Sequence, residues 1–388
     1  MTMETKNDIF QEYVAEYLKA NRDRKGEILD HACFIAKVHR KAAIRKFRAL
    51  QLRDPSKEEK RGRDTFYTAD VTAALKDVWE AASGICGELL HSIIREYVEA
   101  LIRDKMWKHG GEATDKLLFM SEGTAKRRVA GFMKARRIRR GLGSTKPSQL
   151  KVIVPIFTGP WRDKPPGFGQ LDTVVHCGSS LLGDMAYTLN YTDVATLWVI
   201  PRAQWNKGQE ATLRSMKVIK ERLPFPWRGA HPDTGSEFIN WFVIPWCQEE
   251  KIELTRSRPG HKNDNMYVEE RNGHVVRKFV GYIRLDAKET VDLLNQLYDV
   301  LAVYLNHFVP VRKCIEKVRI GSKYKRVHGQ AQTPYQRVLL HKAVSEEIKE
   351  RLRAEHGKLN PLILKQEVDR LTTKVYAIQK RHGKSKND

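Results

Sequence analysis

The stretch HPDTGSEF, residues 231–238, places one carboxylate, Asp233, between a proline and a Thr-Gly turn, just after an apolar run at residues 225–230. The chain as a whole is strongly basic: it has 70 Lys and Arg residues and 47 Asp and Glu residues, which give a formal net charge of +23. This balance is typical of proteins that bind polyanions, and nucleic acid is the leading candidate partner. An acid at a turn in such a chain therefore calls for an explanation.

The basic residues gather in clusters such as RRGRDTF, KARRIRRG and KVRIGSKYKR. Clustering favours a nucleic-acid partner over the alternative, a globular protein whose lysines are simply solvated. The 388 residues allow two to four domains, and a hydrophobic content of 41% supplies ordinary packed cores.

The five cysteines are widely spaced and form neither a CxxC pair nor a zinc-ligand pattern. The N-terminal residues lack the charged-then-apolar pattern of a secretion signal, and no apolar run is long enough to span a membrane. We therefore expect a cytoplasmic, DNA-associated protein with no membrane contact.

Residues 28–50 predict two helices joined by a tight turn near residues 34–38, with basic residues on the second helix. This spacing fits a helix-turn-helix DNA-binding module over residues 1–52, and it fits an ordinary helical hairpin equally well. The candidate DNA contacts in it are Arg40, Lys41 and Arg45. A polar, proline-containing linker follows at residues 52–64 and indicates a boundary.

A second helical DNA-binding module is expected over residues 64–145. Ser121 is a plausible helix cap, and Lys126, Arg127 and Arg128 follow it as candidate DNA contacts. Helical spacing of apolar residues predicts burial rather than base stacking for a set of larger side chains. They are Trp79, Phe119, Phe132 and Met133.

Residues 160–310 change to short β runs followed by helices. Three strands in quick succession predict antiparallel hairpins, and then come a helix at 207–223, a short strand before Asp233, a helix at 238–251, the strand IELTRSR, and a helix at 265–283. That order predicts an α/β domain with a mixed five-stranded sheet, as in ribonuclease H-like folds. Residues 311–388 predict a basic hairpin turning at Gly321 and Ser322, then helices, the last capped by Asn360.

Three acids in the α/β region form a candidate metal site. Asp172 lies in the first strand, Asp233 follows the fourth, and Glu269 lies in the first turn of the last helix. If the fourth strand pairs beside the first, the two aspartates converge and Glu269 packs beside them. Hard carboxylate oxygens suit Mg²⁺ or Mn²⁺, and two such ions catalyse in-line phosphoryl transfer. Other acids in this region are better explained as turn caps or surface charges than as metal ligands. They are Asp184, Asp193, Glu237, Asp264 and Glu270.

The segments LDTVVHCG, HPDTGSEFIN and TRSRPGHKNDNMYVEERNG resemble the catalytic core of DDE transposases and retroviral-type integrases, especially those of bacterial insertion sequences. VHRKAAIRKF and FMSEGTAKRRV are similar to the N-terminal DNA-binding part of that group, and YLNHFVPVRKCIEKVRIGSKYKR with QTPYQRVL to its C-terminal part. The resemblance implies that Asp172, Asp233 and Glu269 are the metal-binding catalytic acids. Thr234 departs from the usual Asp-Asn-Gly pattern and puts substrate positioning beside Asp233 in doubt.

Basic and amide side chains also fill the loop before Glu269, where we expect them to hold DNA phosphates near the metals. The alternative is a solvated basic loop. These candidates are Arg256, Arg258, His261, Lys262, Asn263 and Asn265.

The sequence itself predicts metal-assisted phosphoryl transfer on a polyanion. The resemblance implies more: strand cleavage at the ends of a mobile element, transfer of the 3′-hydroxyl into double-stranded target DNA, and a homo-oligomer assembled on that DNA. The alternatives are a ribonuclease H-like nuclease without strand transfer and a domesticated DNA-binding regulator. A tyrosine recombinase is disfavoured, because it would form a covalent phosphotyrosine and need no divalent metal, whereas the three acids predict a metal site.

Overall fold

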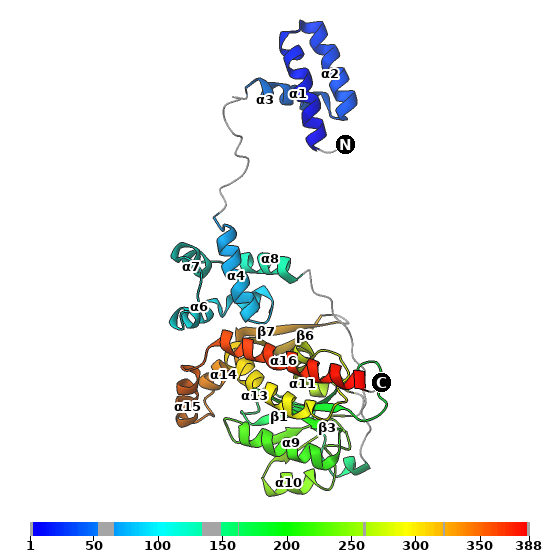
Figure 1. Ribbon diagram of the computed structural model, residues 1–388, viewed down its shortest axis with the longest axis vertical. Helices are drawn as coiled ribbons and strands as arrows, with labels where there is room; N and C mark the ends of the chain where they lie inside the picture. The colour runs from blue at the N-terminus through cyan, green and yellow to red at the C-terminus, as the bar shows by residue number, and fades with distance from the viewer. Residues whose placement is uncertain are drawn as a thin grey trace. The chain divides into compact units, whose positions relative to one another are not determined.

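A computed structural model describes residues 3–52, 66–133, 149–161, 163–258, 261–320 and 323–385 (Figure 1). The chain divides into two compact units, Met1–Phe66 and Tyr67–Asp388. The finer division at residues 64–145, 160–310 and 311–388 stays a prediction. No helix in the described ranges is long and apolar enough to cross a bilayer.

In its described residues the first unit consists of α1 (Met3–Lys19), α2 (Arg22–Ala36) and α3 (Arg40–Gln51). Lys37 ends α2 in the left-handed conformation, and the His39 ring accepts a hydrogen bond from Lys41 N at the start of α3. The predicted turn is therefore correct, whereas α1 was not anticipated. Phe47 of α3 is fully buried and stacks on Tyr17, so α1 completes the core.

The second unit begins with a helical block of α4 (Ala69–Ala81), α5 (Gly87–His91), α6 (Ile94–Arg103), α7 (Gly111–Leu118) and α8 (Glu122–Met133). Ser121 caps α8 as predicted, because its hydroxyl accepts from Thr124 N at 3.3 Å. Trp79 is buried and Phe132 packs against the same core. The predicted burial of Phe119 and Met133 is wrong: 84% of Phe119 is exposed, because it lies past the end of α7, where Met120 enters the core instead.

A mixed five-stranded sheet forms the centre of the second unit. Its strands are β1 (Phe168–Val175), β2 (Ala186–Asp193), β3 (Val199–Trp205), β4 (Gly229–His231) and β5 (Glu253–Leu254), in the order β3-β2-β1-β4-β5. β1, β2 and β3 pair antiparallel, whereas β4 is parallel to both β1 and β5. The predicted sheet is confirmed, including the fourth strand beside the first.

Helices cover both faces of this sheet (Figure 1). Alternate residues along β1 enter different cores: Val174 packs with α13 (Thr290–Phe308), and Leu171 packs with α9 (Gln209–Arg222) and α10 (Val243–Glu249). The helix predicted at 238–251 starts late, at Val243, and the side-chain oxygen of Asn240 accepts from Phe242 N and Val243 N just before it.

The helix predicted at 265–283 is interrupted. A 3-10 turn (Lys262–Asn265) leads into α11 (Met266–Asn272), which continues as a π-helical turn (Gly273–Arg277) and α12 (Lys278–Val280). The amphipathic spacing of this segment indicated a helix but gave no sign of the wider turn.

The C-terminal region forms the predicted hairpin and helices. β6 (Val311–Ile320) pairs antiparallel with β7 (Lys323–Gln332), with Ile320 opposite Lys323. The turn residues Gly321 and Ser322 lie outside the described residues. α14 (Pro334–Leu340), α15 (Glu346–His356) and α16 (Pro361–Ser385) follow, and Asn360 caps α16 by accepting from Leu362 N at 2.9 Å.

Buried tyrosines bind the helical block to the rest of the second unit. Tyr304 of α13 donates to the Ala81 carbonyl at 2.6 Å, and Tyr97 of α6 donates to the Phe308 carbonyl at 3.3 Å. The block and α13 also share one hydrophobic core. The position of the block against the sheet is therefore fixed by specific contacts.

Gly87 lets α5 approach the backbone of α8, because a Cβ there would lie 2.6 Å from Lys126 Cα. We expect Gly87→Ala to lower the free energy of unfolding by about 1–3 kcal/mol, the usual cost of overpacking. Gly123→Ala is the matched control in α8, where nothing lies within 4 Å of the added Cβ. Urea unfolding measures both, and equal midpoints for the two variants would refute the close approach.

Candidate active site

Two of the predicted acids lie close to the paired ends of adjacent parallel strands, Asp172 within β1 and Asp233 two residues after β4. Gln170 of β1 is paired with His231 of β4. Continuing this register by two residues on each chain brings Asp172 level with Asp233, on the same side of the sheet. Glu269 lies in α11, which contacts both β1 and β2. The fold therefore brings together the segments that carry all three acids.

Gln170 joins β1 to the start of α11. Its side-chain oxygen accepts from Tyr267 N at 2.9 Å and from Val268 N at 3.3 Å, and its nitrogen donates to the Asp264 carbonyl at 2.8 Å. The side chain has no exposure to solvent. It satisfies amides that the first turn of a helix leaves without a partner, so α11 begins at a fixed point beside Asp172.

Asn265 joins the end of β4 to the same helix start. With its amide nitrogen facing the His231 carbonyl, it donates there at 3.2 Å and its oxygen accepts from Asp233 N at 3.2 Å. This buried residue was predicted to contact DNA. In this amide orientation its contacts fix the backbone that carries Asp233, and its contact with DNA stays a prediction.

Two asparagines orient the Asp172 carboxylate. Asn272, at the end of α11, donates to Asp172 Oδ2 at 2.6 Å, while Thr173 N donates to Oδ1 at 2.8 Å. Asn190, directly across from Asp172 on β2, donates to Asn272 Oδ1 at 2.9 Å. Neither asparagine was predicted from the sequence, although Asn272 lies three residues after Glu269 and so on nearly the same helix face.

Burial, together with neighbouring negative charges, raises the pKa of Asp172. Asp172 keeps part of its surface in solvent, but dense protein surrounds its carboxyl. Desolvation by that protein, together with the negative charges of Asp233 and Glu269, raises the Asp172 pKa to about 7. The three carboxylates are thus close enough to repel one another, and a cation among them would relieve the repulsion.

The donor chemistry fits a hard divalent cation, because all three groups offer carboxylate oxygens. Within the described ranges, no three His, Cys, Asp or Glu side chains already stand as a set of metal ligands. Asp172 and Asp233 both accept internal hydrogen bonds, the latter from Gly235 N at 2.8 Å. Each oxygen has a second lone pair, so a cation can be held without losing these bonds.

A fourth carboxylate, Glu237, lies beside Asp233. It is 1% exposed, accepts from the Thr173 hydroxyl at 3.2 Å, and pairs with Lys207 at 3.4 Å. Its Oε2 and Asp233 Oδ1 both lie within 3 Å of the position that a Cβ on Gly235 would take. Glu237 was set aside at the sequence level as a flanking acid, since burial of a carboxylate leaves no mark in the residue pattern.

The remaining acids near the site have structural partners. Asp193 closes the turn after β2 by accepting from Gly167 N and Thr196 N, each at 2.7 Å. Asp264 accepts two hydrogen bonds from the Arg258 guanidinium. Asp184 is exposed and accepts from Asn206 at 3.0 Å. Their expected structural role matches these contacts.

The predicted DNA contacts outside the core differ in exposure. Arg40, Lys41 and Arg45 are exposed along α3, with Arg40 paired to Asp30. Lys126 and Arg127 are exposed on α8, where Lys126 pairs with Glu88. Arg128 is engaged internally, because it donates to the Tyr67 carbonyl at 2.9 Å and to the Thr72 hydroxyl. Contact of these residues with DNA stays a prediction.

The loop before α11 is partly buried. Arg256 is 8% exposed and donates to the Val154 carbonyl at 2.9 Å, so it anchors residues 149–156 to the loop. Arg258 is bound to Asp264, whereas His261 is exposed. The side chains of Lys262 and Asn263 lie outside the described residues. The structure therefore gives Arg256, Arg258 and Asn265 contacts within the fold, and their contact with DNA stays a prediction.

Replacing Gln170 with leucine should loosen α11 from β1. The change orphans the Asp264 carbonyl and the amides of Tyr267 and Val268, and each buried unpaired group costs about 1–3 kcal/mol. In the leucine variant we expect amide hydrogen exchange in residues 264–272 to become faster than in the unchanged protein, with α13 as the internal reference. Gln170→Glu keeps the acceptor and should give a smaller effect. Unchanged exchange in the leucine variant would show that other contacts hold α11.

No protein-family model matches the chain. Among solved structures, the catalytic core domain of BIV integrase has 14% sequence identity and a TM-score of 0.30, covering 50% of this chain and 97% of that one. The HTLV-2 integrase catalytic core domain in complex with magnesium (dimeric form) has 15% identity and a TM-score of 0.30, covering 39% and 93%. TM-scores this low do not establish a shared fold.

A much closer similarity exists at the sequence level. The uncharacterized protein y4rM of Sinorhizobium fredii (strain NBRC 101917 / NGR234) is 34% identical over 332 residues, which are 84% of this chain and 93% of that protein. Similarity of this extent over nearly the whole length shows common descent, and the chain therefore belongs to the same protein family as y4rM.

Proposed function

We propose that the protein is a DNA transposase or integrase, which cleaves a DNA strand and transfers the new 3′-hydroxyl into a second duplex. The observation that carries this proposal is the placement of three acids on segments that the fold brings together: Asp172 in β1, Asp233 after the adjacent parallel strand β4, and Glu269 in α11. These acids are proposed as the catalytic and metal-binding residues.

The surrounding residues support a polar site held in one arrangement. Gln170 holds the start of α11, which carries Glu269, and Asn265 holds the backbone at Asp233. Asn272 orients Asp172. Divalent ions bound by these acids, Mg²⁺ or Mn²⁺ and two per site, would activate the attacking hydroxyl and stabilise the leaving oxygen. Burial and the negative charges of Asp233 and Glu269 raise the Asp172 pKa, and a bound cation would offset both effects.

The charge of the chain supports DNA as the substrate. A formal net charge of +23 attracts phosphate backbones, and the exposed basic residues of α3 and α8 offer surfaces for them. We propose that the first unit and the helical block bind the ends of a mobile element. Each chain supplies one acid triad, so processing two ends requires a multimer assembled on DNA.

Two alternatives differ from this proposal in measurable ways. A ribonuclease H-like nuclease would hydrolyse DNA without joining a 3′ end to another duplex. A DNA-binding regulator would need no acids in the site. The hydrogen-bonded network that holds Asp172 among other carboxylates disfavours this alternative, because a regulator would gain nothing from keeping like charges together. Strand transfer with a labelled 3′ end separates all three.

Removing one ligand charge should abolish chemistry but spare DNA binding. We expect Asp172→Asn, Asp233→Asn and Glu269→Gln each to reduce cleavage and joining more than about 100-fold, since even partners of metal ligands are worth up to that much. Gel shift and strand-transfer assays on the same samples measure both properties. Asp184→Asn, an exposed acid in a turn, is the matched control and should remain active.

Normal joining by any of the three variants would remove that residue from the site. Loss of DNA binding together with activity would instead indicate a folding defect, which circular dichroism of the same samples detects.

Activity should also depend on the identity of the divalent cation. Mg²⁺ and Mn²⁺ should support cleavage and joining, whereas Ca²⁺ should support DNA binding without chemistry, because its longer and looser coordination fits compact two-ion geometry poorly. Strand-transfer assays with each cation after chelator treatment provide the measurement. Full activity in excess chelator would contradict metal-assisted catalysis.

A further inference from the structure

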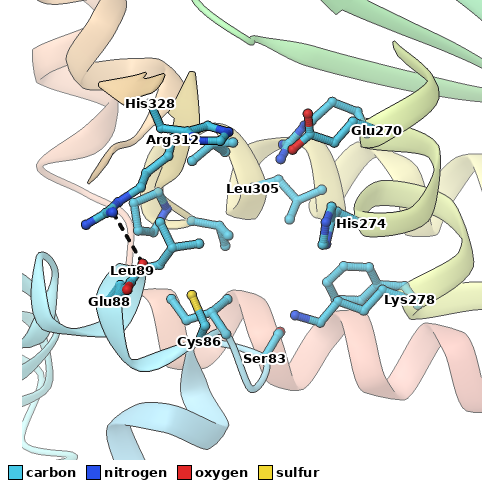
Figure 2. Close-up of a pocket in the computed structure, with 16 residues that line it drawn as sticks. Ser83, Cys86, Glu88, Leu89, Glu270, His274, Lys278, Leu305, Arg312 and His328 are labelled. Carbon is cyan, nitrogen blue, oxygen red and sulfur yellow. Dashed lines mark ion pairs between the residues drawn. The ribbon is translucent and has the colours of Figure 1, made fainter. Parts of the chain in front are cut away.

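A cavity of about 290 Å³ lies in the second unit, away from the acid cluster, where three segments meet (Figure 2). One wall comes from the start of α5 and the residues before it, a second from α11 and the π-helical turn, and a third from β6. No part of the proposed catalytic chemistry uses this space.

Arg271 of α11 lines the cavity and carries a buried charge. It is 4% exposed, and its Nε and Nη2 have no hydrogen-bond partner in the structure as described. No ion pair joins it to an acid within the described residues. A guanidinium stays protonated at all physiological pH values, and an uncompensated buried charge is strongly unfavourable. Glu270, the preceding residue, also lines the cavity and interacts with this charge, but Nε and Nη2 of Arg271 donate no hydrogen bond to it in the described structure and can bind a further anionic group.

Further cationic and ring nitrogens face the cavity from opposite sides. His274 and Lys278 lie on one wall, and Arg312 and His328 lie across from them (Figure 2). Arg312 pairs with Glu88 at 3.3 Å, but its Nε has no partner among the described groups. Glu88, on the α5 wall, is thus paired with Arg312, and Lys126 pairs with it as well.

The space between these walls is apolar. Leu89 and Leu305 lie between the two sets of nitrogens in Figure 2. Val309 and Phe279 are among the other apolar residues that line the cavity. An inorganic anion alone would leave these side chains facing water. An anion carried on a flat or apolar body would use both the charge and the apolar surface.

We propose that this cavity binds the phosphate of a nucleotide, with Arg271 as the principal anion-binding residue and Leu89, Leu305 and Val309 contacting the sugar or base. A phosphate matches the planar donor fork of a guanidinium, and several surrounding cations favour a group of more than one negative charge. The volume suits one nucleotide. The shared chemistry covers a free mononucleotide and an unpaired nucleotide of a DNA strand.

The proposal does not depend on the acid cluster. Successive residues of a helix differ by about 100°, so Arg271 faces nearly away from Glu269, two residues earlier. Binding can therefore be measured in chelator, where metal-dependent chemistry is absent, and its failure would leave the proposed catalysis untouched.

The test uses the full chain and isothermal titration with each of the four deoxynucleoside 5′-monophosphates, the matching nucleosides, and inorganic phosphate. The second arm compares a blunt duplex with a duplex that carries one unpaired 5′-phosphorylated nucleotide. Two variants remove different features: Arg271→Gln removes the charge, and Leu89→Trp fills the cavity. Arg214→Gln, an exposed arginine on α9, is the matched control.

We expect a monophosphate or the unpaired nucleotide to bind, with affinity at least tenfold weaker in Arg271→Gln and in Leu89→Trp and unchanged in Arg214→Gln. The arm that shows this pattern identifies the source of the nucleotide. Occupancy should also slow alkylation of Cys86, which lines the cavity and is exposed, but not of Cys33 in the first unit.

Nucleotide binding that is equal in all variants, or no binding in either arm, would overturn the proposal. Binding of inorganic phosphate as tight as that of every nucleotide would overturn the assignment of the apolar lining. Thermal unfolding of each variant shows that loss of binding is not loss of fold.

Discussion

The side-chain amide of Gln170 is the interaction on which the arrangement of the site depends. It lies on a strand shared by both hydrophobic cores of the second unit, and it holds the first amides of α11 and the carbonyl that precedes them. Because α11 is only seven residues long, its position is set where it starts. One buried amide thus determines where the helix that carries Glu269 and Asn272 meets the strand that carries Asp172. The hydrogen bond from Asn272 to Asp172 is a second contact between that helix and the strand.

Electrostatics supply the second constraint. A chain with a net charge of +23 concentrates carboxylates at one end of a central sheet, where burial and mutual repulsion raise the pKa of Asp172. Folding gains nothing from this arrangement, since carboxylates are more stable in water or beside a basic side chain. Buried Glu237 adds to the excess, although Lys207 offsets part of its charge. A divalent cation bound by these acids, as proposed above, would relieve the repulsion, and the basic residues elsewhere would serve the proposed DNA substrate.

The parts of the fold that could be predicted from sequence are those with a local signal. Alternating apolar residues and turn signals predicted the strands, and parallel pairing of the fourth strand with the first brought Asp172 and Asp233 level. The buried amides were not predictable, because Gln170, Asn190 and Asn272 look like surface residues until their partners are known. Phe119 was wrongly placed in the core because helical spacing does not reveal where a helix ends. Arg256 was taken for a surface cation, and only the structure brings the Val154 carbonyl to it.

The short helix α11 also links the two sites. It presents Glu269 toward the acid cluster and Arg271 toward the cavity, and a π-helical turn follows directly after Asn272. Gln170 restrains only the start of the helix, whereas its end continues into a turn with a different hydrogen-bond pattern. A ligand that neutralises Arg271 acts on the half of α11 that is not held by Gln170, and that half includes the asparagine that orients Asp172. An anion bound at Arg271, as proposed, would therefore lie on the same short helix as Asn272, whose side chain donates to Asp172, and α11 is the shortest structural connection between the two sites.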